Sequence, residues 1–215
     1  MSDWYYTLVR AIGTPAFWVS ASPVVLHRER VPMTGPVILA ATHFSPYDVP
    51  LLIKDTKRRL DFVSIIEVFS NRWVRWFFNN MNVIPIDRSR VDTAATRRVL
   101  ERLLKGRAVA MFPEGRIVTD EQSVLSGGKI RPGAFGLARA ANCPIIPCVV
   151  LGSRAYSKPI AWAPLRRTNY GLIYGEPLVP DESWDDSERP EQMLRDAYAE
   201  LHAELRQMLG NRKVV

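Results

Sequence analysis

His43 is the histidine whose position best suits catalysis. It directly follows the apolar run Val37–Ala41 and stands five residues before Asp48. We expect Ser45 to cap a helix that begins at Pro46, so that Asp48, as its third residue, folds back toward His43. A carboxylate on one imidazole nitrogen fixes the tautomer and leaves the other nitrogen as a general base. The pattern therefore predicts a His43–Asp48 general-base pair.

Other interpretations of this pair stay open. Asp48 also fits a simple helix cap, with His43 an ordinary loop residue. A metal site is not expected, because no further histidine lies nearby and the sequence has no cysteine pair at the spacing of metal ligands. The remaining histidines, His27 and His202, lie among charged residues typical of a surface.

Two arginine-bearing segments also follow apolar runs. One contains Glu114, Gly115 and Arg116, and the other ends at Arg88. Ligands of α/β sheets bind at the carboxyl ends of strands, Gly115 permits a tight turn, and Arg116 offers a bidentate fork for a phosphate. An ordinary turn with surface charge is the alternative. If these segments converge on His43, they predict a site for a phosphorylated substrate.

Short apolar runs alternate with helical patterns along the chain, as in an α/β domain. The predicted strands are Val37–Ala41, Phe62–Ile66, Val83–Ile86, Ala108–Phe112, Ile145–Leu151 and Leu172–Tyr174. The predicted helices are Asn71–Met81, Val91–Lys105 and the segment from Pro190 to Gly210. The sequence thus predicts a single α/β domain whose central sheet, mostly parallel or mixed, is flanked by helices.

Composition favours a folded cytoplasmic protein. Hydrophobic residues make up 47% and charged residues 24% of the 215 residues, so we expect a buried core and exclude a disordered chain. Cys143 and Cys148 flank a stretch that looks extended, which would hold their Cα atoms roughly 16 Å apart. We therefore exclude a disulfide-stapled secreted fold and expect reduced thiols.

Positive charge is concentrated in the first four-fifths of the chain. Residues 1–170 carry 24 basic and 12 acidic side chains, whereas residues 171–215 carry 5 and 10. Such an excess attracts polyanions, which include nucleic acid, an anionic membrane and phosphorylated small molecules such as coenzyme A derivatives. Charge alone leaves these three open.

The N-terminal segment is apolar and aromatic. Ala11–Leu26 has no charged residue, but it is shorter than the ~20 residues of a bilayer span and contains Pro15 and Pro23. No basic region precedes it, so we do not expect a cleaved signal peptide. We predict that residues 1–31 form a helical segment in the headgroup layer, ahead of an enzyme domain at residues 32–215. Packing of this segment on its own domain is the alternative.

Four segments of the chain follow one another in a recognisable order. They are Thr42–Asp48, Ile84–Arg88, Phe112–Arg116 and Cys143–Pro147. Together they resemble the motif blocks of the glycerolipid acyltransferases, the lysophosphatidic acid acyltransferase or PlsC-like family. Lys129–Ala134 is similar to the glycine-alanine turn that precedes a short helix in that family. The resemblance extends from roughly Pro36 to Leu151.

The resemblance implies roles for individual residues. His43 would deprotonate the acceptor hydroxyl, and Asp48 would orient the imidazole. Arg88 would bind the phosphate of the acceptor. The turn of Glu114, Gly115 and Arg116 would bind the acceptor as well.

The same resemblance implies further contacts and a donor. Lys129 and Arg131 would be further substrate contacts, and the Cys143–Pro147 block would be structural or line the acyl site. Acyl-CoA or acyl-ACP would serve as co-substrate, and neither a cofactor nor a metal is implied.

Several positions depart from the family pattern. Thr42 replaces the usual Asn, Asn82 the usual Gly, Ile66 a frequent Lys, and Arg116-Ile117 the Thr-Arg pair. The His43–Asp48 pair is unchanged. The acceptor headgroup therefore stays open between lysophosphatidate and lysophosphatidylethanolamine-type acceptors.

The residues and the resemblance together predict an acyltransferase of phospholipid biosynthesis. It would esterify a hydroxyl of a lysophospholipid, such as 1-acylglycerol-3-phosphate, as a peripheral or monotopic protein at the cytoplasmic face of an anionic membrane. The predicted helix Asn71–Met81 would line an acyl-chain groove, meet the bilayer or form an ordinary core helix. The residues that would do so are Trp73, Trp76, Phe77, Phe78 and Met81.

Three alternatives remain at this point. One is an acyltransferase that acts on another lyso-lipid or an amino-lipid, and another is a lipid-binding protein without activity. A third, from a different class, is a basic nucleic-acid-binding module, favoured by the net charge of +7 and by arginines interleaved with aromatic residues at 71–78. No recognition motif for nucleic acid accompanies that charge, so we do not expect nucleic acid as a partner.

Overall fold

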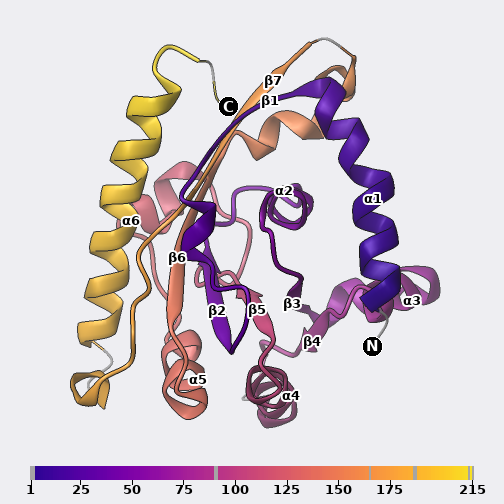
Figure 1. Ribbon diagram of the computed structural model, residues 1–215. Coiled ribbons are helices and arrows are strands. Elements are labelled where there is room, and N and C mark those ends of the chain that lie inside the picture. Colours follow the sequence, from indigo (N-terminus) through magenta and orange to yellow (C-terminus); the bar gives the residue numbers. More distant parts are fainter. Residues whose placement is uncertain (1–2, 90–91, 165, 186–187, 213, 215) are drawn as a thin grey trace.

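A seven-stranded mixed sheet runs through the centre of the protein (Figure 1). The computed structural model describes residues 3–89, 92–164, 166–185, 188–212 and 214. The strands are β1 Ala21–Leu26, β2 Val37–Ala41, β3 Leu60–Ile65, β4 Ile84–Ile86, β5 Ala108–Met111, β6 Ile145–Leu151 and β7 Thr168–Tyr174. Their order across the sheet is β1-β7-β6-β2-β5-β3-β4. Because β2 to β6 are mutually parallel, their carboxyl ends share one edge.

Helices cover both faces of this sheet. They are α1 Asp3–Ser20, α2 Asp48–Asp55, α3 Arg72–Asn80, α4 Thr93–Leu104, α5 Gly133–Ala141 and α6 Glu188–Leu209. One core lies between the sheet and α4, α5 and α6, and the other lies under α1, α2 and the short helical turns 153–157 and 159–162. Figure 1 shows α6 and α1 on opposite sides of the sheet. The predicted α/β class and flanking helices are confirmed.

Strand β2 shows why the central strands are apolar throughout. Ile38 and Ala40 face the α4–α6 side, whereas Val37, Leu39 and Ala41 face the α1–α2 side, and all five are fully buried. A parallel strand covered on both faces has no solvent-facing positions, so its sequence is a continuous apolar run. This run carries the chain directly to His43 at the shared edge.

The predicted elements agree closely with the observed ones. Strands β2 and β6 have the predicted bounds, β3, β4 and β5 differ by one or two residues, and β7 begins four residues earlier than predicted. Helices α3, α4 and α6 match the three predicted helices; residue 91, where the second was expected to begin, lies outside the described residues. Asn71 and Asp92 cap α3 and α4 with their side chains.

Strand β1 was not predicted. Residues 21–26 belong to the apolar segment that we assigned to the headgroup layer, yet they pair in parallel with β7, from Ala21 opposite Thr168 to Leu26 opposite Ile173. Pro23 is compatible with this position because β1 is the outermost described strand of the sheet, with no partner on one side. Pro15 lies inside α1 and does not end that helix.

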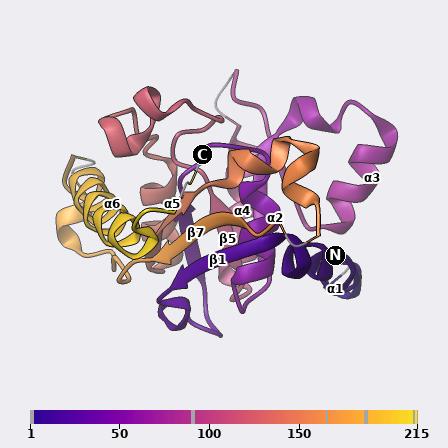
Figure 2. The same ribbon diagram turned by 90° about the horizontal axis from the view of Figure 1, so that it is seen from above.

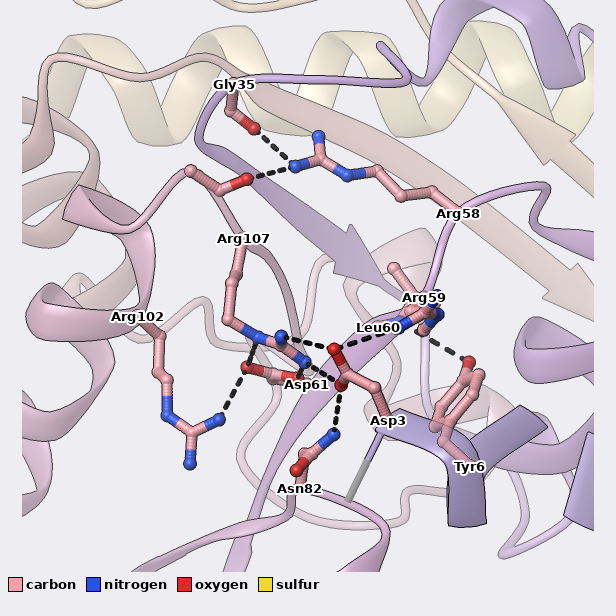
Figure 3. Close-up of polar contacts among 11 residues, drawn as sticks. Asp3, Tyr6, Gly35, Arg58, Arg59, Leu60, Asp61, Asn82, Arg102 and Arg107 are labelled. Atoms are coloured by element: carbon pink, nitrogen blue, oxygen red, sulfur yellow. Dashed lines mark hydrogen bonds and ion pairs between the residues drawn. The ribbon is translucent and has the colours of Figure 1, made fainter. Parts of the chain in front are cut away.

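An ionic cluster attaches the first turn of α1 to the amino ends of β3 and β5 (Figure 3). The buried Asp61 accepts hydrogen bonds of 2.6 Å from Nε and Nη2 of Arg107 and of 3.1 Å from Nη1 of Arg102. Arg107 also donates to Asp3, which pairs with Arg59 at 2.8 Å. Hydrogen bonding to Asp61 raises the pKa of Arg107 further. The cluster therefore fixes α1 on the body of the protein.

Asn82 joins the same cluster through an unusual backbone conformation. Its φ is 60°, in the left-handed region that favours glycine but also admits asparagine. Its side-chain Nδ2 donates to Asp3 at 3.2 Å. Asn82 therefore adopts a conformation typical of glycine and, through its side chain, contacts α1.

Candidate active site

The end of β2 leads into a tight turn that brings His43 and Asp48 together. Nδ1 of His43 lies 3.0 Å from Oδ2 of Asp48, and the backbone N–H groups of Phe44 and Ser45 donate to the same oxygen at 2.7 and 2.8 Å. The carboxylate thus reaches back to the preceding residues, as in a capping box. Our expectation that Ser45 caps the helix is wrong, because α2 begins two residues later, at Asp48, and Tyr47 occupies the cap position.

The imidazole of His43 is held on its face and on one nitrogen. The ring of Phe112 stacks on it with centroids 3.8 Å apart and planes 14° apart. The side chain is 14% exposed, and no hydrogen bond to Nε2 occurs within the residues that the structure describes. With Nδ1–H donated to Asp48, Nε2 is the nitrogen left to accept a proton. This is the geometry of a general base with its orienting carboxylate.

Glu114 is part of the support of His43. Its side chain is buried, Oε2 accepts from the backbone N–H of His43 at 2.6 Å, and Oε1 accepts from Ser123 and Val124 at 3.1 Å each. Burial raises the pKa of Glu114, and these three hydrogen bonds oppose the rise. Both oxygens already have protein partners. These contacts support the backbone of His43, and a contact of Glu114 with an acceptor stays a prediction.

Gly115 and Arg116 complete the turn after β5. Gly115 has a φ of 70°, in the left-handed region that favours glycine, and a Cβ there would lie 2.2 Å from Nε of Arg131 and displace that side chain. Arg116 is exposed and donates to Gln122 at 3.1 Å. The backbone N–H of Arg131 donates to Pro113 at 2.9 Å. The structure thus brings Arg131 against the Glu114–Arg116 turn.

The predicted cationic residues share the edge that carries His43. Arg88, Arg116, Lys129 and Arg131 are all exposed. Arg88 follows β4, which is separated from β5 by β3 alone, a distance of roughly 10 Å across two strand spacings. No contact joins Arg88 to the other three in the described residues. The arginines that follow β4 and β5 therefore lie at the same, carboxyl ends of the strands. Arg88 is farther from His43, toward the outermost strand β4.

Thr42 and Ser123 make buried hydrogen bonds near the site that the sequence did not predict. Thr42 is buried, and its hydroxyl accepts from the backbone N–H of Val150 at 3.0 Å, so this departure from the family pattern lies inside the fold. Ser123 is also buried against Glu114. It belongs to no motif and stands nine residues from its partner, so no sequence signal identified it.

The two cysteines are poorly placed for nucleophilic chemistry. Both thiols are buried, and burial raises the pKa of Cys143 to about 11 and that of Cys148 well above its usual value. Neither thiol therefore forms a nucleophilic thiolate at neutral pH. Among the described residues, no group of three or more His, Cys, Asp or Glu side chains is placed to hold a metal ion.

Comparison with known proteins identifies the family of this site. Residues 23–151 match the model of the Acyltransferase family, a range that covers more than half of the chain and contains the turn of His43 and Asp48 as well as Glu114, Gly115, Arg116 and Arg131. The 1-acyl-sn-glycerol-3-phosphate acyltransferase of Bacillus subtilis is 24% identical over 156 residues, which are 72% of each chain. The chloroplastic enzyme LPAT1 of Arabidopsis thaliana is 26% identical over 155 residues, or 70% of this chain and 42% of that protein.

A solved structure supports the fold. The 1-acyl-sn-glycerophosphate acyltransferase PlsC from Thermotoga maritima superposes with a TM-score of 0.73 over 97% of this chain and 81% of that one. The sequence identity is 19%, so this likeness concerns the arrangement of helices and strands alone. It agrees with the seven-stranded sheet and its flanking helices.

Proposed function

Because the chain belongs to the Acyltransferase family, we propose that it moves a fatty acyl group from a thioester of coenzyme A or acyl carrier protein to a free hydroxyl of a lysophospholipid, such as 1-acylglycerol-3-phosphate, in phospholipid biosynthesis. The observation that carries the proposal is the His43–Asp48 pair, 3.0 Å apart, at the carboxyl end of a central strand. The family match favours acyl transfer over the nucleic-acid-binding alternative.

His43 acts as the general base in this proposal. Nε2 takes the proton of the acceptor hydroxyl while that oxygen attacks the thioester carbonyl, and the C–S bond then breaks to release the thiolate. Asp48 holds Nδ1–H and stabilises the imidazolium that forms. The proton passes from the imidazolium to the thiolate or to solvent. A thiolate is a stable leaving group, so the step needs little help from a general acid.

The acceptor phosphate is assigned to the exposed cations of the same edge. Arg116 and Arg131 flank Gly115, which directly follows Glu114, the residue that binds the backbone of His43. Arg88 lies farther out along the sheet. Exposed guanidinium groups at strand ends suit bidentate binding of a phosphate. Lys129, two residues before Arg131, adds charge. These four residues are our candidates for the headgroup site.

A long apolar face of α1 favours work at a membrane surface. Trp4, Leu8, Ile12, Trp18 and Val19 are between 44% and 72% exposed. At 3.6 residues per turn they form one stripe along a helix about 27 Å long. Tryptophan favours the membrane–water interface, and no described helix is long and apolar enough to cross a bilayer. We propose that this stripe lies in the headgroup layer.

Helix α3 extends the stripe. None of its side chains is buried, and Trp73, Trp76 and Phe77 are 69%, 56% and 37% exposed. Tyr5 of α1 makes edge contacts with Trp76 and Phe77, with ring centroids 5.3 and 6.1 Å apart. Figure 2 shows α3 projecting on the side of the molecule that carries α1. The proposed membrane face therefore combines both helices, and α3 is not an ordinary core helix.

Turnover with defined substrates tests the acyltransferase proposal. The protein is incubated with labelled acyl-CoA or acyl-ACP and 1-acylglycerol-3-phosphate, and labelled diacyl product is measured. We expect product from wild-type protein and a loss of about 100-fold or more in His43→Ala, with His202→Ala as the matched control at a histidine on α6. Lipid retention without product would indicate a binding protein instead. Turnover of His43→Ala at the wild-type rate would overturn the mechanism.

Liposome sedimentation tests the membrane face. Ile12→Ser and Trp18→Ser should weaken sedimentation with anionic vesicles, because each removes an exposed apolar side chain from the stripe. Met208→Ser is the matched control, since Met208 is 55% exposed on α6. If all three variants sediment with vesicles as wild type does, this stripe is not the membrane-binding surface. Substitutions are a cleaner test than a truncation, because removing residues through Leu26 would also remove strand β1.

A further inference from the structure

Arg154 reaches the turn of His43 from the neighbouring strand. It belongs to the helical turn Ser153–Ser157, directly after β6, and β6 runs parallel to β2 with Cys148 opposite Ala41. Gly152 has a φ of 85°, and a Cβ there would lie 2.7 Å from the carbonyl oxygen of Asn169. The chain therefore turns sharply at a position that requires glycine, and this turn carries Arg154 to the exit of β2.

The guanidinium group of Arg154 joins two separate segments. Nε donates to the carbonyl of Phe44 at 3.2 Å, and Nη2 donates to the carbonyl of Val118 at 2.7 Å. Nη1 donates to the exposed Asp120 at 2.9 Å, and the guanidinium carbon lies 5.2 Å from the ring centroid of Phe44. A planar fork with several donors can hold three acceptors at once in a way that a single ammonium cannot.

Both segments are in direct contact with the backbone of His43. The N–H of Val118 donates to the carbonyl of His43 at 3.0 Å, and the N–H of Phe44 donates to Asp48 at 2.7 Å. With the bond from His43 N–H to Glu114, every backbone polar group of His43 and Phe44 has a partner. Arg154 supplies the last of these partners. The backbone beneath the imidazole is thus fully constrained.

We propose that Arg154 is a positioning residue for acyl transfer. It ties the carbonyl of Phe44 to the 118–120 segment, and this keeps the imidazole of His43 aligned between Asp48 and the acceptor hydroxyl. Arg154 itself contacts neither substrate. The proposal rests on the general-base role of His43 proposed above. Arg154 lies three positions beyond the family match. It was not among the residues that we predicted for the site.

Arg154→Lys is the primary variant. It keeps the positive charge but cannot span the three acceptors. We expect kcat to fall about 10- to 100-fold, because a small displacement of a catalytic group has effects of this size, with the KM values of donor and acceptor unchanged. Arg154→Ala should lose at least as much. Steady-state kinetics and thermal melts give the kcat of folded protein.

A spectroscopic signature gives a readout that does not depend on turnover. The Nδ1–H proton that His43 donates to Asp48 is expected as a downfield NMR resonance, identified by its absence in His43→Gln. In Arg154→Lys this resonance should broaden, because a loosened imidazole exchanges the proton with water faster. If wild-type protein acylates no lysophospholipid, the proposed function fails, and this resonance still decides the role of Arg154.

Arg58→Ala is the matched control. Arg58 also donates to backbone carbonyls, those of Pro32, Thr34 and Gly35, but these lie near the amino ends of the strands. Figure 3 shows its contact with Gly35. Its loss should lower stability and leave both kcat per folded molecule and the resonance unchanged.

Three outcomes would overturn the proposal. One is a raised KM with unchanged kcat in Arg154→Lys, which would make Arg154 a substrate ligand. Another is an activity loss that follows the folded fraction while the resonance stays sharp. The last is wild-type kinetics with a wild-type spectrum.

Discussion

The sheet has one buried aspartate near the amino ends of its strands and another near the carboxyl ends. The two carboxylates are held by different kinds of hydrogen-bond donor. Asp61, near the amino ends of the strands, accepts from the guanidinium groups of Arg102 and Arg107. Asp48, beyond the carboxyl end of β2, accepts from two backbone N–H groups and the imidazole of His43. Its second oxygen, Oδ1, has no hydrogen-bond partner among the described residues.

This difference separates a structural carboxylate from a functional one. The charge of Asp61 is cancelled by neighbouring arginines, so it stabilises the attachment of Arg107 and, through it, of α1. The charge of Asp48 is held by neutral donors and is not cancelled by any described cation in contact with it. It remains able to act on a positive charge that forms on His43 during catalysis.

Replacing Asp48 should have the largest effect. In Asp48→Asn the imidazole loses the carboxylate that fixes its tautomer, so we expect kcat to fall by at least about 100-fold. The loss of a helix-start carboxylate should also cost about 0.5–1 kcal/mol of stability. Turnover assays with thermal melts measure both effects.

The double variant His43→Ala/Asp48→Asn is the control for a shared role. Residues that act as a unit are not additive, so the double variant should be no slower than His43→Ala alone. Normal turnover combined with lower stability in Asp48→Asn would leave Asp48 as a helix cap only.

Replacing Asp61 should affect stability and not catalysis. Asp61→Asn removes the buried charge that compensates Arg107, and breaking such a pair costs about 3 kcal/mol. Urea unfolding should show a lower midpoint, while kcat measured on folded protein stays at the wild-type value. A fall in kcat without a change in the unfolding midpoint would contradict the assignment of Asp61 to stability and Asp48 to catalysis.

The arginines of the two edges differ in the same sense as the aspartates. Arg107 is engaged by Asp61 and Asp3, whereas Arg88 is exposed and makes no ion pair within the described part of the chain. If Arg88 binds the acceptor phosphate, Arg88→Lys loses the bidentate fork and should raise the acceptor KM about tenfold, equivalent to ~1.4 kcal/mol.

Arg97→Lys, at an exposed arginine paired with Glu101 on α4, is the matched control for Arg88→Lys. The donor KM should not change in either variant. A rise of the donor KM in Arg88→Lys would assign Arg88 to the phosphates of coenzyme A instead.

Local sequence was sufficient to predict the central strands and the pairing of His43 with Asp48. Strand β2 is a continuous apolar run, and the five-residue spacing to Asp48 lies within one turn, so both depend on neighbours in the chain. The parallel order of the strands then places the turn after β5 on the same edge as His43. This is why the position of the candidate site could be predicted before its contacts were known.

Features that join distant segments could not be predicted. Strand β1 is defined by pairing with β7, whose residues are almost 150 positions away, and its own sequence includes Ser22 and Pro23. Arg154 meets Phe44 and Val118 only after β6 is placed beside β2. Neither partnership leaves a periodic pattern in the sequence, so it becomes visible only in the folded chain.

The attachment of α1 gives the smallest predicted effect, and one that depends on pH. The hydrogen bond from Arg107 lowers the pKa of Asp3 below its usual value of 3.8 in the folded state. Ionised Asp3 therefore contributes stability above about pH 3.8, and that contribution is lost as the pH falls through the lower folded-state value. Because Asp3 is 40% exposed, the contribution should stay below about 1 kcal/mol.

Asp3→Asn isolates this contribution. Urea unfolding should show the variant slightly less stable than wild type at pH 6, and the difference should shrink as the pH falls below 3.8, because the unfolded wild-type chain then takes up a proton at Asp3. Asp196→Asn, at an exposed carboxylate that accepts from the neutral Gln192, is the matched control. A difference between Asp3→Asn and wild type that stays constant from pH 6 to pH 3 would mean that the ion pairs of Asp3 do not stabilise α1. The cluster at the amino edge would then depend on Asp61 and its arginines alone.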